Sequence, residues 1–234
     1  MSSYKVSLLH DGYFEIDMGM LVYLRGSYYG KKYRAALKPM LIQCDGGNIL
    51  IDTGMGELPE HLAGFYKVQR DGKGILMSLR EHGLHPDDIN IVVNTHLHVD
   101  HAGNNHLFEN ARIYVQKREI EFALNPARWM RGGYIAEEIK RLKLHPITGD
   151  CTIVDGVRTI LTGGHTPGHQ AVIVETGENT YIYCGDIAPL RENLEKRSIV
   201  GILTNPQEAQ DALDLLASMK GVHIFAHDNT QISI

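Results

Sequence analysis

The chain has 234 residues, and its 23 lysines and arginines against 28 aspartates and glutamates give a formal net charge of −5 at pH 7. This acidic balance disfavours a polyanion such as nucleic acid as a partner. Hydrophobic residues make up 43% of the chain and charged residues 22%, which is ordinary for a soluble globular protein. The length is enough for one sizeable core, so we expect residues 1–234 to form a single domain.

The three cysteines, Cys44, Cys151 and Cys184, lie far apart and form neither a C-x-x-C pair nor a disulfide framework. Reduced thiols in a cytosolic protein are the simplest account of them. Residues 1–5 contain no apolar signal region, and no run approaches the ~18 apolar residues of a membrane span. We therefore expect a cytoplasmic protein without a membrane partner.

Short strands are predicted at the start of the chain. Residues 4–9 and 13–16 predict two strands around a turn, and residues 39–44 and 48–52 predict a hairpin. Between them, residues 18–33 are rich in tyrosine and glycine, which fits either a mobile flap over a pocket or a surface loop packed by its rings. The candidates for a substrate pocket in this segment are Tyr23, Tyr28 and Tyr29.

A dense group of potential metal ligands follows an apolar run at 89–93, which predicts a buried strand. His96, His98, Asp100 and His101 occupy six positions. Alternate side chains of an extended segment share a face and lie roughly 6.5–7 Å apart, so His96 and His98 point the same way. Imidazoles and carboxylates are ligands that zinc, iron and manganese accept. The pattern predicts a site that holds one metal and begins a second.

Helices are expected around this strand. Residues 74–82 have an amphipathic pattern that ends at Gly83, and residues 117–124 and 135–142 are further predicted helices. Trp129, the only tryptophan, falls in the loop between the last two. It either lines the pocket or serves for packing alone.

The second half repeats this plan. Runs of β-branched or aromatic residues between glycine turns predict strands at 152–154, 159–161, 170–175 and 180–184. A helix capped by Asn205 ends at Gly221, and a last buried strand is expected at 223–226. Strands broken by helices in two similar halves predict two sheets packed face to face with helices outside.

Three later fragments place a ligand-type residue just after a predicted strand. A glycine-bracketed turn contains His165 and His169, the strand at 180–184 leads to Asp186, and the last strand leads to His227. Loops at one edge of a sheet sandwich converge on one point. We therefore expect these fragments to complete the metal site.

The motifs together resemble the metallo-β-lactamase superfamily over almost the whole chain. They are Thr95 to Gly103, Thr166-Pro167-Gly168-His169, Gly185-Asp186 and Ala226-His227-Asp228, with Ile51-Asp52-Thr53-Gly54 upstream. Within the superfamily, the N-acyl-homoserine lactonases are the most similar, because of residues 101–104, 166–170 and 227–228. The resemblance implies an α/β fold, an αββα sandwich of two mixed sheets with outer helices, and a two-metal centre.

The resemblance assigns the ligands position by position. The first metal would be held by His96, His98 and His169, the second by Asp100, His101 and His227, and Asp186 would bridge both. His165 stays structural in this scheme. Asp52, at a strand end, would either cap a turn or hold a ligand histidine by its other ring nitrogen. Two divalent ions, zinc foremost, are implied, although the same donors suit iron, cobalt or manganese.

Two positions depart from the family patterns. The common zinc β-lactamases have a cysteine where this chain has Asp186, and Cys184 is a poor substitute, so antibiotic hydrolysis is not expected. Lactonases carry a lactone-binding tyrosine three residues after the bridging aspartate, where this chain has Pro189. A tyrosine from residues 18–33 could replace it.

The implied activity is opening of a small lactone by a metal-bridging hydroxide, with Asp100 or Asp186 as proton acceptor and donor. One alternative is another ester or thioester hydrolase of the superfamily. A glyoxalase II-like thioesterase is less favoured, because the chain ends shortly after the last predicted ligand. The other alternative is a non-hydrolytic di-iron redox or sensing module. The expected partner is a small ester or lactone, and a homodimer is left open.

Overall fold

The computed structural model describes residues 4–72 and 74–234. Residues 1–3, which belong to the segment expected to lack a signal region, lie outside this description, as does residue 73. No helix within the described ranges is both long and apolar enough to cross a membrane.

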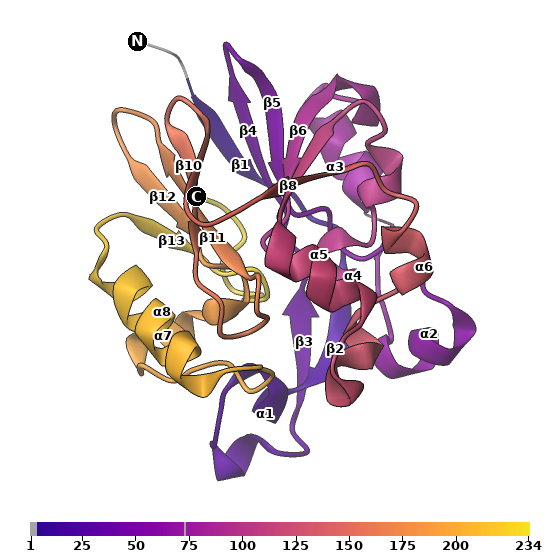
Figure 1. The fold of residues 1–234 in the computed structure, drawn as a ribbon, viewed down its shortest axis with the longest axis vertical. Helices are drawn as coiled ribbons and strands as arrows, with labels where there is room; N and C mark the ends of the chain where they lie inside the picture. Colours follow the sequence, from indigo (N-terminus) through magenta and orange to yellow (C-terminus); the bar gives the residue numbers. More distant parts are fainter. Residues whose placement is uncertain (1–3, 73) are drawn as a thin grey trace.

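Two larger sheets form the centre of the molecule (Figure 1). The first has the order β1 (Lys5–Leu8), β4 (Met40–Cys44), β5 (Gly47–Ile51), β6 (Ile89–Val93), β7 (Arg112–Gln116) and β8 (Leu144–Ile147). The second has the order β13 (Val222–Ile224), β12 (Thr180–Tyr183), β11 (Gln170–Glu175), β10 (Val157–Leu161) and β9 (Cys151–Val154). Both are mixed, because β5 to β8 run parallel, as do β12 and β13, while the other pairs are antiparallel.

Helices cover the outer face of each sheet (Figure 1). The helices are α1 (Met18–Leu21), α2 (Glu60–Tyr66), α3 (Ile75–Glu81), α4 (Val99–Ala102), α5 (Lys117–Leu124), α6 (Ala136–Ile139), α7 (Arg191–Glu195) and α8 (Pro206–Ser218). Short 3-10 turns lie at Gly26–Tyr28, Pro86–Asp88, Asn105–Leu107, Arg128–Gly133 and Gly185–Ile187.

Alternation along the strands explains the layers. Ile49 and Ile51 of β5 face the core between the sheets, whereas Leu50 faces the core under α3, α5 and α6. In β11, Val172 and Val174 face the inner core, and Ile173 packs with α8. Strands that bury both faces need cover on both sides, so this pattern dictates helix, sheet, sheet and helix. The predicted αββα sandwich is confirmed.

The two N-terminal strands, although neighbours in the sequence, do not pair with each other. β1 pairs with β4 of the first sheet, while β2 (Tyr13–Asp17) pairs with β3 (Lys32–Ala36) in a separate two-stranded ribbon. Phe14 and Ile16 of β2 pack with Leu62 and Tyr66 of α2 in a fourth apolar cluster. The ribbon therefore carries α2 toward the edge where the loops of both sheets gather.

Several predicted elements have different bounds in the structure. The hairpin of β4 and β5 is confirmed, and Asn205 caps α8 by accepting from the amides of Gln207 and Glu208. The helix predicted at 135–142 is the shorter α6, and Trp129 lies in a 3-10 turn. Residues 18–33 contain α1, a 3-10 turn and the start of β3, and Tyr29 in this segment is 58% exposed.

Candidate metal centre

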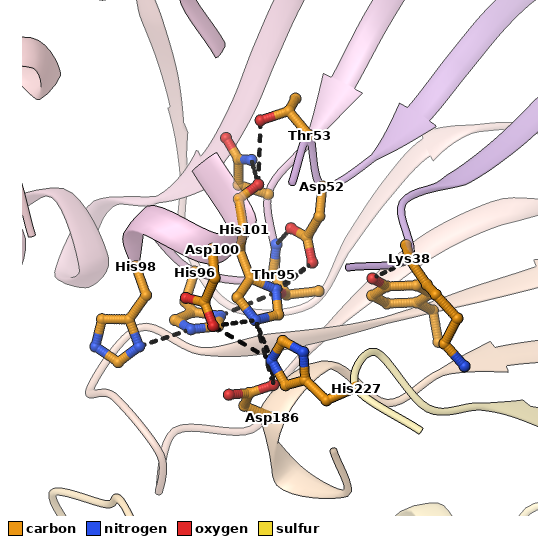
Figure 2. A network of polar contacts seen from close by, with 12 residues as sticks. Lys38, Asp52, Thr53, Thr95, His96, His98, Asp100, His101, Asp186 and His227 are labelled. Carbon is orange, nitrogen blue, oxygen red and sulfur yellow. Dashed lines mark hydrogen bonds and ion pairs between the residues drawn. The ribbon is translucent and has the colours of Figure 1, made fainter. Parts of the chain in front are cut away.

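The ligand-type residues meet at one edge of the sandwich. His96 to His101 follow β6 and enter α4, Asp186 follows β12, and His227 follows β13. Because β5 and β6 are parallel, as are β12 and β13, their carboxyl ends bring these loops to one place. Figure 2 shows the side chains of Asp100, His101, Asp186 and His227 converging from these elements.

Three buried histidines form the first cluster. Nδ1 of His98 lies 2.9 Å from Nε2 of His96, and Nε2 of His165 lies 3.2 Å from His96 Nε2 and 3.0 Å from His98 Nδ1. Burial is the largest cause that lowers the pKa of all three, to about 3 for His98. Neutral imidazoles whose lone pairs converge are the form that binds a divalent metal, so this cluster fits a cation.

Two histidines and a carboxylate form the second cluster. Nε2 of His101 lies 3.1 Å from Nε2 of His227, which lies 3.4 Å from Oδ2 of Asp100. Burial opposes protonation of both histidines, but neighbouring carboxylates outweigh it, Asp186 foremost, and raise the pKa of His227 to about 9. Protonated His101 and His227 place positive charge beside these carboxylates. A bound cation would supply the same positive charge, so this cluster also fits a metal.

Asp186 lies between the two clusters. Its Oδ1 is 3.3 Å from Nε2 of both His101 and His227, and its Oδ2 is 3.5 Å from Nε2 of His165. Oδ1 is buried and has no well-formed hydrogen bond to the described residues. Burial would raise the pKa of Asp186, but His227 and His101 outweigh it and hold the pKa well below its usual value. A charged carboxylate in this position fits the predicted bridging role.

The outer nitrogens of His101, His165 and His227 are also held, whereas Nε2 of His98 has no hydrogen-bond partner among the described residues. Oδ2 of Asp52 lies 2.7 Å from Nδ1 of His101, and Oδ1 of Asp52 accepts from the amide of Thr95 at 2.8 Å (Figure 2). Asp52 thus makes the contact that a supporting role for His101 would require. The other such contacts join His165 Nδ1 to the carbonyl of Ile202 at 2.6 Å and His227 Nδ1 to the carbonyl of Ala36 at 2.8 Å. Such partners fix ring orientation and tautomer.

His169 does not join the first cluster, which corrects the sequence prediction. Its Nε2 accepts from the backbone amide of Asp186 at 2.9 Å, and its Nδ1 lies 2.7 Å from Oγ1 of Thr162. A neutral imidazole has one donor and one acceptor, so both nitrogens of His169 are used within the protein. His169 holds the backbone of Asp186, and His165 takes the place expected of it.

The turn before His165 explains this exchange. Gly163 and Gly164 both have positive φ, at 61° and 77°, a conformation that glycine adopts without steric cost. The chain therefore doubles back and directs His165 inward. Ligand spacing alone does not separate two histidines four residues apart, and in the sequence the glycine pair marks only a turn before His165.

A cavity of about 130 Å³ opens onto the two clusters. His98, Asp100, His165, Asp186 and His227 line its polar side. Its other walls are mainly apolar and include Phe65 and Tyr66 of α2 with Trp129. Phe65 is 59% and Trp129 74% exposed, so these two rings border the mouth of the cavity. The site can therefore hold a small molecule with a polar reacting group and an apolar tail.

The predicted pocket residues are only partly found there. Trp129 lines the cavity, but Tyr23, Tyr28 and Tyr29 are not among its described lining residues. The hydroxyl of Tyr28 donates to Glu192 at 2.6 Å instead. Tyr66, whose hydroxyl donates to the carbonyl of Gly132 at 3.0 Å, was missed because no motif marks α2 in the sequence.

The two departures from the family patterns have structural counterparts. Cys184 packs in the outer core with α8, and burial raises the pKa of its thiol to about 12, so it does not substitute for Asp186. The carbonyl of Pro189 accepts from the amide of His227 at 3.0 Å. The chain at Pro189 thus helps to place a candidate ligand.

Sequence comparison identifies a family and named relatives. The model of the metallo-beta-lactamase superfamily matches residues 39–225. The chain is 31% identical over 208 residues to the N-acyl homoserine lactonase AiiA of Bacillus thuringiensis subsp. kurstaki, covering 82% of this chain and 80% of that protein. It is 27% identical over 228 residues to the N-acyl homoserine lactonase AttM of Rhizobium radiobacter, covering 87% and 83% respectively.

Solved structures agree with this. A quorum-quenching N-acyl homoserine lactone lactonase has a TM-score of 0.83 and 29% identity, with 99% of this chain and 95% of that chain covered. An N-acyl homoserine lactone hydrolase with N-hexanoyl-L-homoserine bound at its catalytic metal centre has a TM-score of 0.83 and 28% identity, with 99% and 96% covered.

Proposed function

Because the chain belongs to the metallo-β-lactamase superfamily and its relatives are N-acyl homoserine lactonases, we propose that it is a di-metal hydrolase that opens small lactones of the N-acyl homoserine lactone type. The observation that carries this proposal is the position of Asp186 between two ligand clusters, at the floor of a cavity with apolar walls. A two-metal centre can activate a water for attack on an ester carbonyl, and an apolar wall can hold an acyl chain.

The proposed ligand set follows the two clusters. His96, His98 and His165 would hold one ion, Asp100, His101 and His227 the other, and Asp186 would bridge them. When bound, two such cations supply an activated water and polarise the ester carbonyl. We propose zinc as the metal, because nitrogen and oxygen donors in these numbers suit it.

The chain's own residues supply the remaining steps. Water adds to the lactone carbonyl carbon, the ring C–O bond breaks, and the ring oxygen must receive a proton. Asp100 and Asp186 line the cavity as carboxylates, the pKa of Asp100 being about 2 because His101 and His227 outweigh the effect of burial. Either carboxylate can accept the proton of water and pass it to the leaving oxygen. Phe65 and Trp129 would hold the acyl chain against the apolar wall.

The decisive experiment couples a metal assay to a substrate panel. Purified protein is analysed for metal content and then tested on acyl-homoserine lactones, aryl esters and thioesters. We expect about two equivalents of zinc and preferred turnover of the lactones. Turnover of thioesters alone, or an iron-rich redox-active protein without esterase activity, would contradict the proposal. The His96→Ala, His98→Ala double variant is the control and should lose both metal and turnover.

The setting of the enzyme is proposed on separate grounds. All three cysteines are free thiols, which supports the cytoplasm as the compartment. The candidate ligands come from loops of both sheets, which supports residues 1–234 acting as one domain. Light scattering coupled to gel filtration distinguishes a monomer of 26.2 kDa from the homodimer that the sequence leaves open.

A further inference from the structure

Glu119 is a fully buried carboxyl that none of the proposed chemistry uses. It lies in the first turn of α5 and has no exposed surface. Burial raises the pKa of its carboxyl, while hydrogen bonds oppose that effect. A buried carboxyl is costly unless several donors satisfy it, so its contacts indicate why such a group stands here.

Those contacts reach two separate loops. Oε1 of Glu119 accepts from the backbone amide of Leu97 at 3.0 Å and from the hydroxyl of Tyr134 at 3.1 Å. Oε2 accepts from the hydroxyl of Thr166 at 2.5 Å. The chain at Gly168 also packs closely against the start of this helix, since a Cβ on Gly168 would lie 2.2 Å from the backbone nitrogen of Glu119.

Each partner is next to a candidate ligand of the first cluster. Leu97 stands between His96 and His98, and Thr166 follows His165 directly. The ring of Tyr134 lies with its centre 4.6 Å from that of His98. One carboxylate is therefore joined to both segments that supply the three converging nitrogens.

We propose that Glu119 is a positioning residue for the first metal, a role that rests on the proposed function. Its carboxylate fixes the distance between the His96–His98 segment and the His165 turn, so that the three nitrogens already face one point before a cation arrives. A ligand set that is held in advance binds its ion more tightly, because less order has to be gained on binding. Glu119 is not among the described residues that line the cavity.

The test uses the full-length protein, zinc as the probe and a chromophoric chelator as competitor. Glu119→Gln keeps the side-chain volume but replaces one carboxylate oxygen by an NH2 group. That group cannot accept hydrogen bonds from the donors that the oxygen binds in the wild type. We expect zinc affinity at the first site to fall about 10–100-fold, the range typical of residues that orient ligands, with affinity at the other site within a few fold. Excess zinc should restore much of the lost turnover.

A matched control is Asp11→Asn. Asp11 is also a fully buried carboxyl, and it accepts from Arg70, Asn104 and the amides of Met55 and Ile75, without contacting the segments of the first cluster. We expect it to lower the melting temperature and to leave first-site zinc affinity unchanged. A folded Glu119→Gln protein with wild-type zinc affinity at both sites, whatever its melting temperature, would overturn the inference.

A second variant decides the matter if Glu119→Gln does not fold. Thr166→Val with Tyr134→Phe removes two donors and leaves the carboxylate in place, and about a tenfold loss of first-site zinc affinity is expected. Unchanged affinity would again overturn the inference. A wild-type protein that binds two zinc ions but opens no lactone would contradict the proposed function alone.

Discussion

At the scale of single residues, the exchange between His165 and His169 gives the sharpest test. His165→Ala removes a nitrogen that faces His96 and His98, so we expect loss of about one zinc per chain and more than a hundredfold loss of turnover. His169→Ala removes a contact to the backbone of Asp186, so both metals should stay and turnover should fall about 10–100-fold. Metal analysis beside kinetics separates the two, and the reverse pattern would restore the sequence-based assignment.

The raised pKa of His227 in the second cluster predicts how the stability of the metal-free protein depends on pH. The pKa of His227 is raised to about 9 in the fold. Its protonation therefore stabilises the protein fully below its usual value near 6.5, and this contribution is lost as the pH rises through 9. We expect the free energy of unfolding, measured by urea titration with chelator present, to decline between pH 6.5 and 9.

His227→Asn should show a smaller decline over this range. Asp100 acts in the opposite sense, because its pKa is lowered to about 2, and its contribution is lost only as the pH falls from about 4 through 2. Metal-free protein that grows more stable from pH 6.5 to 9 would contradict this account of the cluster.

Much of the site could be predicted from residue order, and the exceptions have a common physical cause. His96, His98, Asp100 and His101 are adjacent in the chain, so local geometry alone brings them together. The choice of His165 depends on how two glycines turn the backbone, and a count of residues does not contain that turn. Tyr66 reaches the cavity through tertiary packing of α2, which no local pattern in the sequence marks.

At the scale of elements, the pattern of apolar residues predicted where the strands lie, because both faces of these strands are buried. It located both strands within residues 4–16 but does not give their partners, since pairing partners are chosen by packing across the molecule. β1 joins β4, while Phe14 of β2 packs against the ring of Tyr66 with ring centres 6.0 Å apart. Neighbouring strands in sequence thus entered different sheets.

The start of α8 allows a prediction at this scale. Asn205 accepts from the amides of Gln207 and Glu208 at 3.1 and 3.2 Å. Asn205→Ala should lower the free energy of unfolding by ~1 kcal/mol, as is usual for a lost helix cap, without changing zinc content. Urea unfolding measures this, with the exposed Gln207→Ala as control. A variant as stable as the wild type would show that Pro206 alone defines this helix start.

At the scale of the whole molecule, the candidate ligands tie both sheets together. His96 to His101 belong to the first sheet's loops, whereas Asp186 and His227 follow strands of the second. A metal that binds only the folded arrangement stabilises it by mass action, by about 2.7 kcal/mol at a hundred times its dissociation constant. We expect chelation to lower the melting temperature and zinc to restore it, and His165→Ala to show a smaller effect. A melting temperature insensitive to zinc would argue against a metal bound by loops of both sheets.

The position of His227, three residues after the end of β13, has a consequence for biosynthesis. A nascent chain still lacking this strand contains His96 to His101, yet it lacks His227, which the proposed second site requires. Loading of the full pair of ions must then wait until translation has passed β13. A fragment released by a premature stop before that strand would sequester one ion at most and would have no catalytic value.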